Sequence, residues 1–319
     1  MSSQTARLQR QVGLPGAVTI GLGSMVGTGI FVSVGIAASI SGPSVVLAII
    51  IAALVATCNG LNSAQLAASH PVSGGTYEYG YRYLTPWLGF TAGWMFLLAK
   101  SASAATAALG FAGYFSNALA LPSVVFVPLA LAAVLLLTAV AASGIQRSNL
   151  MNAVIVSVTL FGLAAFVVGG FPNVSADHFL PFFAPSSGEG HAVGAFLHAC
   201  ALMFVAYTGY GRIATLGEEV REPRRTIPRA IAATMLVTTV LYVAVAGVAV
   251  GASGASTLGQ VTAGALEARV APLSIAAQGF ALPLGLTGGG DQRCDRHAGR
   301  AAELDPGLVA RGAGHGPSR

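Results

Sequence analysis

Charge is scarce in this sequence. Only 8% of its 319 residues are Asp, Glu, Lys or Arg, and Lys100 is the single lysine. A soluble domain carries about 25% charged residues. Because 54% of the chain is hydrophobic and the mean hydropathy is +0.73, the deficit excludes an ordinary water-exposed surface. It predicts a protein embedded in lipid.

Cysteine and catalytic motifs are also scarce. Cys58, Cys200 and Cys294 have no spacing typical of a metal site or a disulfide, and we expect small buried hydrophobic residues there. The apolar runs contain no paired carboxylates, no His-rich ligand set and no nucleophile motif, which argues against a membrane-bound enzyme. We therefore predict no catalytic residue, no metal and no cofactor. The net charge of +5 comes from basic loops between apolar runs, so topology explains it better than a nucleic-acid partner.

Long apolar runs dominate what is present. A membrane-spanning helix needs roughly 20 apolar residues. The candidate spans are residues 14–40, 43–68, 86–116, 122–142, 150–170, 191–217 and 229–252, and an eighth begins near 271 and stops after Leu286. Residues 1–12 form a short polar lead-in with Arg7 and Arg10, and we expect a cytoplasmic N-terminus without a removable signal peptide.

The arginines predict the orientation of these spans. With the N-terminus in the cytoplasm, the outer side collects only Arg269. The inner side collects Arg7, Arg10, Arg82, Arg147, Arg221, Arg224, Arg225 and Arg229. This asymmetry follows the positive-inside rule and predicts a multi-pass protein of the cytoplasmic (inner) membrane.

The C-terminal residues 291–319 differ from the rest of the chain. They are rich in charge, Gly, Ala and Arg and show no periodicity. One interpretation is a disordered polar cytosolic tail. The other is that the tail is out of frame, because codon degeneracy allows a one-base shift to encode an apolar helix; the protein would then be C-terminally truncated or frameshifted. Resequencing the DNA distinguishes the two.

The stretch GLGSMVGTGIF, residues 21–31, places four glycines inside the first apolar run. It does not fit a dinucleotide-binding fingerprint, whose spacing and soluble setting differ. Gly23 and Gly27 could form a helix-packing motif. Alternatively, the glycines could break the helix, since each costs a helix roughly 1 kcal/mol relative to Ala. Unwound backbone at membrane depth is tolerated where it lines a cavity, and there it can bind an anion and a cation.

A broken first span demands a second interruption in an inverted repeat. The sixth run supplies one in MFVAYTGYGRIATLGEEV, with Gly209 and Gly211. GLGSMVGTGIF, PVSGGTYEYGYRYL and ATLGEEVREPRRTIPRAI together resemble the amino acid–polyamine–organocation (APC) permease superfamily, in particular its bacterial amino acid permeases. The resemblance implies an all-α, polytopic inverted-repeat transporter with broken first and sixth helices. It also implies a first five-span repeat at 13–170 and a partial, incomplete second repeat at 191–290.

The resemblance also implies a substrate site. Gly27, Thr28 and Gly29 would offer amides to a substrate carboxylate, and the carbonyl of Met25 would accept from its amine. The sixth span would bound the site with four further residues: Val205, where family members often place a side-chain-sensing residue, and Ala206, Tyr207 and Thr208. Because no acid stands among these residues, the pattern favours neutral or small amino acids over cationic ones.

Several charged and polar residues are candidates for coupling or gating. Lys100 lies inside the third span, where a charge is expensive and often functional, although it could also snorkel to an interface. Thr159 occupies the place of a fifth-span lysine that replaces a sodium ion in some proton-coupled relatives. Arg212 follows the second interruption. Glu218 and Glu219 could pair with loop arginines as a cytoplasmic gate, or simply lie in a solvated loop.

The predicted function is secondary active transport of amino acids or related amines by alternating access, with a proton or sodium ion as the coupling ion. The expected partners are this substrate, the coupling ion and the lipid bilayer. A non-transporting amino acid sensor or an inactive permease fragment is the alternative. The sequence makes no prediction of oligomeric state.

Overall fold

The computed structural model describes residues 12–72, 74–119, 121–143, 145–183, 191–258 and 271–278. Over these ranges the chain is almost wholly helical, and the one β-bridge there joins Val12 to Val220. The predicted eighth span is described only at its start. Arg7, Arg10, Arg269, Cys294 and the tail 291–319 lie outside the described residues.

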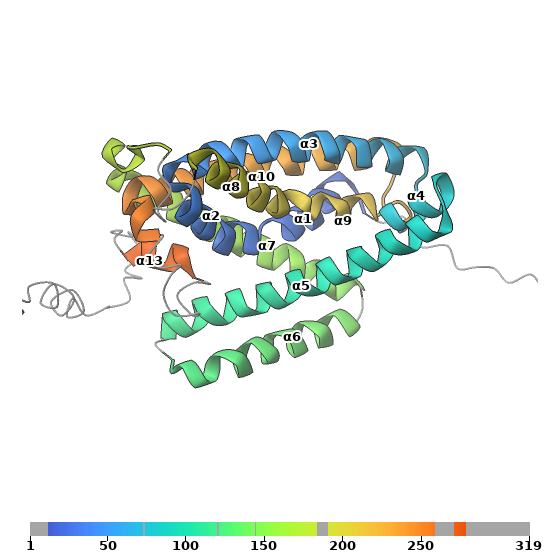
Figure 1. Ribbon diagram of the computed structural model, residues 1–319. Coiled ribbons are helices and arrows are strands. Elements are labelled where there is room, and N and C mark those ends of the chain that lie inside the picture. The colour runs from blue at the N-terminus through green and yellow to red at the C-terminus, as the bar shows by residue number, and fades with distance from the viewer. Residues whose placement is uncertain are drawn as a thin grey trace, which may run out of the picture.

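The helices alternate between long spans and short turns (Figure 1). In chain order they are α1 (Leu14–Met25), the π-helix η1 (Gly29–Ser33), α2 (Val34–Ser41), the 3₁₀-helix η2 (Gly42–Ser44), α3 (Val45–Ser69), α4 (Thr76–Tyr83), α5 (Pro86–Leu119), η3 (Ser123–Val125), α6 (Phe126–Ala142), α7 (Ile145–Gly170), η4 (Phe171–Asn173), η5 (Ala176–Phe179), α8 (Ala192–Tyr207), η6 (Thr208–Tyr210), α9 (Gly211–Ala214), α10 (Pro223–Ser253) and α13 (Pro272–Gln278).

Six helical stretches of the described chain are long and apolar enough to cross a membrane, judged by length and composition. The first, Leu14–Ser69, is 56 residues long and reverses direction at η2. Gly42 permits that turn because its φ of 67° is a conformation that other residues adopt only at a cost. With this stretch counted as two arms, the helices correspond to the seven predicted spans, which confirms an all-helical, multi-pass membrane architecture.

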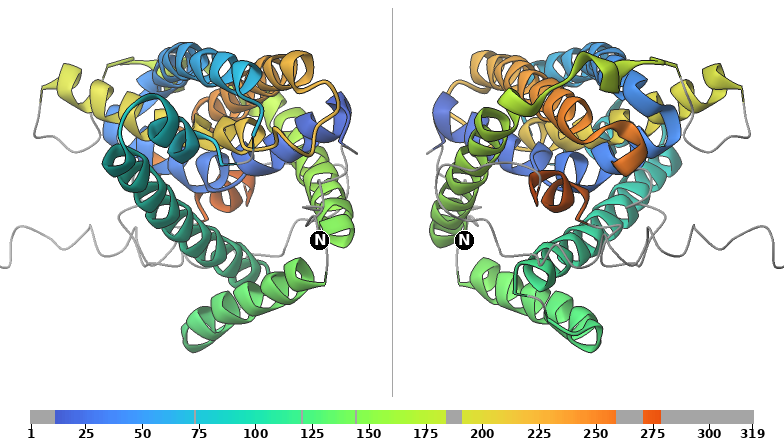
Figure 2. Two further views of the ribbon diagram at one scale, coloured as in Figure 1. Left: turned by 90° about the vertical axis from the view of Figure 1, so that its right-hand side faces the viewer. Right: turned by 90° about the vertical axis from the view of Figure 1, so that its left-hand side faces the viewer.

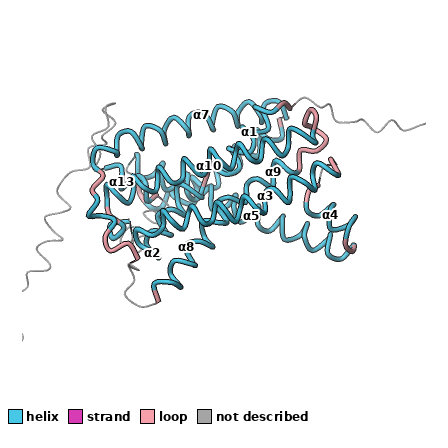
Figure 3. Tube along the Cα trace, turned by 90° about the horizontal axis from the view of Figure 1, so that it is seen from above, coloured by secondary structure: helices cyan, strands magenta, loops and turns pink. Residues whose placement is uncertain are grey.

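The core lies where α3, α10, α1 and α8 pack together. Seen from above, the start of α8 projects obliquely from this bundle (Figure 3). On α3 the buried face repeats small residues at Ala48, Ala52 and Ala56. Residues four apart share one helix face, and small side chains there let neighbouring helices approach closely. α3 therefore packs against both α10 and α8.

α5 and α6 lie at the side of the bundle away from α3 (Figure 2). In the most apolar window of α6 only 11% of the residues are buried, compared with 44% in α10. Leu135 is 70% exposed, and the side chains around it are also large and apolar. Without strong hydrophobic contact to the core, these faces suit lipid, which is as apolar as the side chains themselves.

Candidate functional site

The first span is broken where the glycine stretch predicted a break. α1 ends at Met25, and Val26 leaves the helical region with φ −78° and ψ 87°. The chain resumes at Gly29 as a π-helix, a form that often marks functional sites. The carbonyl of Gly27 accepts the amides of Ile30 and Phe31 at 3.1 and 3.2 Å. The amides of Gly27 and Thr28 therefore stand between two helices.

The sixth span is interrupted more gently. α8 ends at Tyr207 and passes through the 3₁₀-turn η6 into α9. The backbone angles at Tyr207, Thr208 and Gly211 stay in the right-handed helical region, so this segment is tightened rather than unwound. The hydroxyl of Thr208 donates to the carbonyl of Val205 at 2.7 Å, which satisfies one acceptor of the last α8 turn.

The two interruptions contact each other. A Cβ on Gly209 would lie 2.5 Å from the carbonyl oxygen of Ser24 and 2.7 Å from Cγ of Met25. A Cβ on Gly29 would lie 2.6 Å from Cβ of Ala206. Both glycines are thus required by close approach, one from each span. In contrast, a Cβ on Gly27 would meet no atom within 4 Å, so there is open space in front of that residue.

A tyrosine that the sequence analysis missed caps the first break. The hydroxyl of Tyr242, on α10, donates to the carbonyl of Met25 at 2.6 Å, and Tyr242 is fully buried. Its ring lies 5.2 Å from that of Tyr207, centroid to centroid. Thr238, one turn earlier on α10, places its hydroxyl 3.5 Å from the sulfur of Met25. α10 therefore supplies polar groups to the exact end of α1.

A second missed tyrosine lies on the other side of the break. Tyr114, on α5, donates its hydroxyl to the carbonyl of Phe31 at 2.7 Å and accepts the amide of Leu273 at 3.2 Å. The rings of Phe31 and Tyr114 meet edge to face at 5.5 Å. A tyrosine inside an apolar run signals a buried hydroxyl that needs a partner, but the sequence does not identify that partner.

The predicted substrate residues fall into two groups in the structure. Met25, Gly29 and Tyr207 are buried at the contact between the spans, and Gly27, Thr28 and Ala206 are half-buried beside it. Val205, on α8, is 63% exposed, and Thr208, the first residue of η6, is also exposed. The structure therefore brings the first group together and leaves Val205 and Thr208 outside it.

The coupling candidates occupy separate places. Lys100, half-buried on α5, has its ammonium 5.6 Å from the centre of the Phe96 ring and within electrostatic range of Arg212. Arg212 is exposed and donates to the hydroxyl of Thr215 at 3.4 Å. Thr159 is half-buried on α7. No group of three or more His, Cys, Asp or Glu side chains that could hold a metal occurs in the part of the chain described here.

The loop that carries Glu218 and Glu219 is fastened to two neighbouring segments. The amide of Val12 donates to the carbonyl of Glu219 at 3.0 Å, and the amide of Arg221 donates to the carbonyl of Val12 at 2.9 Å. A Cβ on Gly217 would lie 2.7 Å from the carbonyl carbon of Pro71. The entry to α1 is therefore held by backbone hydrogen bonds.

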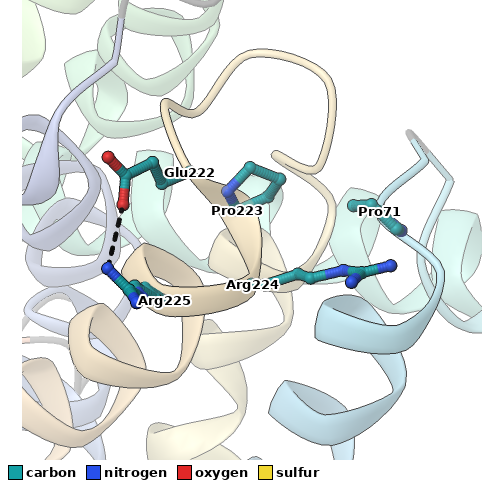
Figure 4. Close-up of a pocket in the computed structure, with 5 residues that line it drawn as sticks. All are labelled: Pro71, Glu222, Pro223, Arg224 and Arg225. Atoms are coloured by element: carbon teal, nitrogen blue, oxygen red, sulfur yellow. Dashed lines mark ion pairs between the residues drawn. The ribbon is translucent and has the colours of Figure 1, made fainter.

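The same end of the bundle contains a cavity of about 430 Å³ lined by Pro71, Glu222, Pro223, Arg224 and Arg225 (Figure 4). An ion pair of 3.8 Å joins Glu222 to Arg225. Glu222 has a φ of 48°, a left-handed conformation that is uncommon outside glycine. Because Pro223 and Tyr242 lie roughly 28 Å apart along α10 at 1.5 Å per residue, this cavity is distinct from the contact between the broken spans.

Comparison with known proteins gives consistent results. A family model described as amino acid permease matches residues 16–283. An uncharacterized transporter of Mycobacterium tuberculosis is 45% identical over 233 residues, which cover 72% of this chain and 50% of that protein. A methylthioribose transporter of Bacillus subtilis is 30% identical over 252 residues, which cover 74% of this chain and 53% of that protein.

A branched-chain amino acid permease of Bacillus subtilis is 28% identical over 249 residues, which cover 72% of this chain and 52% of that protein. The chain thus spans about half the length of the curated relatives it matches.

Proposed function

Because the chain belongs to the amino acid permease family, we propose that it binds an amino acid where its two interrupted spans meet and moves it across the membrane by alternating access. The observation that carries the proposal is the contact between the interruptions, with Gly209 against Ser24 and Gly29 against Ala206. Two interrupted spans that meet at membrane depth are the arrangement that transporters use for substrate sites.

The first break suits a carboxylate. The amides of Gly27 and Thr28 lie outside α1 and η1 at the start of the second helical segment, where the helix dipole favours negative charge. The open space in front of Gly27 leaves room for a ligand. We assign the carboxylate to the amides of Gly27, Thr28 and Gly29.

The ammonium group is assigned to the carbonyl of Met25. A carbonyl oxygen has two lone pairs, so the hydrogen bond from Tyr242 leaves one acceptor position at that atom. Ala206 and Tyr207 complete the enclosure. Val205 and Thr208 face outward, and we assign them to substrate selection in a different arrangement of α8.

The substrate class is a neutral or small amino acid. The residues around the break supply backbone groups and tyrosine hydroxyls, and none of them carries the acid that a cationic side chain would need. One relative is described as a branched-chain amino acid permease, which agrees with a neutral substrate, and another as a methylthioribose transporter, which does not. A branched-chain amino acid and methylthioribose should therefore both be supplied in the uptake experiment.

The orientation follows from the arginines. Arg224 and Arg225 share a cavity with Pro71, so the loop after α3 and the start of α10 lie at one end of the bundle. This end collects positive charge, which supports a cytoplasmic location for it and for the N-terminus in the inner membrane. We propose proton coupling with Lys100 as the proton carrier, since it is the single lysine and lies within a span. Arg212, Thr159, Glu218 and Glu219 are assigned to gating.

Uptake into proteoliposomes tests the proposal. The 319-residue chain is reconstituted, and labelled neutral amino acids and methylthioribose are supplied with and without an inward proton gradient. We expect saturable uptake of a neutral amino acid that the gradient stimulates. Binding without uptake would favour an amino acid sensor, and neither binding nor uptake of any amino acid would refute the proposed function.

A pair of matched variants locates the site. Gly27→Leu places a side chain in the open space in front of the break, where its Cβ meets no atom within 4 Å, so we expect normal membrane insertion and loss of amino acid binding. Gly162→Leu places the same side chain on α7, where a Cβ also meets no atom within 4 Å, and should bind like the unmodified protein. Equal affinity of both variants would place the substrate elsewhere.

A further inference from the structure

Two tyrosine hydroxyls flank the first break, that of the buried Tyr242 and that of the half-buried Tyr114, and each donates to the backbone of this segment. Tyr242, on α10, reaches the carbonyl of Met25, the last residue of α1. Tyr114, on α5, reaches the carbonyl of Phe31, inside the π-helix. The bonds measure 2.6 and 2.7 Å, so both are short and well formed. The break is thus held from two helices that do not belong to it.

The carbonyl of Met25, to which Tyr242 donates, is the one whose helical hydrogen bond is lost at the break. In an uninterrupted α-helix the carbonyl of Met25 would accept the amide of Gly29, four residues later. That bond would close the break. The Tyr242 hydroxyl instead supplies a donor to this carbonyl, and a Cβ on Gly29 would lie 2.6 Å from the same hydroxyl. Tyr242 therefore supplies the donor that this carbonyl loses when the helix breaks, which stabilises the open segment.

Tyr114 has the corresponding role beyond the break. Phe31 is the middle residue of the π-helix, a form whose hydrogen bonds are displaced by one residue relative to an α-helix, and its carbonyl accepts a donor from outside the segment. The hydroxyl of Tyr114 is that donor, and it also accepts the amide of Leu273 at the start of α13. One hydroxyl therefore links α5, the broken span and α13.

We propose that Tyr242 and Tyr114 are positioning residues that hold residues 26–31 in the open geometry to which substrate binds. The effect on substrate affinity rests on the function proposed above. The effect on the backbone of residues 26–31 can be measured without any substrate. Neither tyrosine needs to touch the substrate. Both act by donating to backbone carbonyls beside the break, which stabilises the segment in its open form.

The test compares three tyrosine-to-phenylalanine variants of the full chain. Tyr242→Phe and Tyr114→Phe each remove one hydroxyl from a break carbonyl and leave the ring in place. Tyr79→Phe is the matched control, because the Tyr79 hydroxyl on α4 is also buried but has no hydrogen-bond partner in the described structure. Hydrogen–deuterium exchange of peptides that cover residues 22–35 is measured in detergent without substrate, and the substrate concentration at half-maximal uptake is measured in proteoliposomes.

The expected result separates positioning from general stability. Leaving a buried carbonyl without its donor should change the exchange rate of the break amides roughly tenfold in Tyr242→Phe and Tyr114→Phe. The half-saturation concentration should rise by a similar factor while the maximal rate stays within about twofold, because the closed helix lowers the population of binding-competent protein. Tyr79→Phe should leave the exchange rate and the half-saturation concentration unchanged.

Exchange rates in both break variants equal to those of Tyr79→Phe would overturn the proposal, whatever the uptake shows. So would a rise in half-saturation concentration without a change in exchange, since the hydroxyls would then act on the ligand directly. If the unmodified chain neither binds nor takes up an amino acid, the proposed function fails, and the exchange comparison alone still decides whether the tyrosines hold the break.

Discussion

Gly209→Ala offers a direct test of the contact between the broken spans. The added Cβ would lie 2.5 Å from the carbonyl oxygen and 2.7 Å from the carbonyl carbon of Ser24, and both are backbone atoms that cannot rotate away. Gly211→Ala is the matched control two residues later, because a Cβ there meets nothing within 4 Å. The same chemical change therefore meets backbone at one position and open space at the other.

The expected changes in the free energy of unfolding have opposite signs for Gly209→Ala and Gly211→Ala. Overpacking a well-packed site costs about 1–3 kcal/mol. Alanine is a better helix former than glycine by up to about 1 kcal/mol, which partly offsets this cost at residue 209. We expect a net loss of about 1–2 kcal/mol for Gly209→Ala, and a gain of at most about 1 kcal/mol for Gly211→Ala.

Thermal unfolding of the purified chain in detergent is the assay. For proteins somewhat smaller than this one, each kcal/mol shifts the midpoint by about 2–4 °C, so Gly209→Ala should unfold about 2–8 °C below the unmodified protein. Gly211→Ala should unfold at or above it. Equal midpoints for the two variants, or a lower midpoint for Gly211→Ala, would mean that the spans do not meet as described.

Three further changes test other contacts. Asn59 donates to the hydroxyl of Tyr210 at 2.6 Å, so a double-mutant cycle with Asn59→Ala and Tyr210→Phe should give a coupling energy of about 0.5–1.5 kcal/mol in detergent unfolding; additive effects would contradict the bond. Thr234 is fully buried with a hydroxyl that has no partner in the described structure, so Thr234→Val should be neutral or stabilise the protein by up to about 2 kcal/mol, and a clear drop in the unfolding midpoint would reveal a missed partner. Val12→Pro removes the amide that donates to the carbonyl of Glu219 and should raise the rate at which a protease cuts the chain between Val12 and the start of α1. An unchanged rate would show that this bridge does not hold the entry to α1.

Much of the fold could be predicted because it follows from local composition. Apolar runs of helix length gave the spans, and the gap between the predicted spans 14–40 and 43–68 falls at the reversal that separates α2 from α3. Glycine also located the break near residue 27. Each of these signals lies within a few residues of the structure it causes, so a single sequence is sufficient to identify it.

The contacts that hold the site could not be predicted in the same way. Tyr242 lies 217 residues from Met25 in the sequence. No local pattern distinguishes it from other tyrosines in apolar runs, such as Tyr207. The outward position of Val205 was missed for a related reason, because the family motif gives its place along α8 but not the face of the helix that meets α1.

The break itself therefore has two separate causes. The glycines lower the cost of leaving the helix and allow the close approach of Gly29 to Ala206 and of Gly209 to Ser24. They do not by themselves prevent the helix from closing, because a glycine helix in lipid still gains backbone hydrogen bonds that no water replaces. What favours the open segment is a donor from another helix at a carbonyl that has lost its helical partner. Sequence composition thus permits the open segment, and side chains from α10 and α5 stabilise it. A substrate that binds there needs to supply only the remaining part of the free energy for keeping the span open.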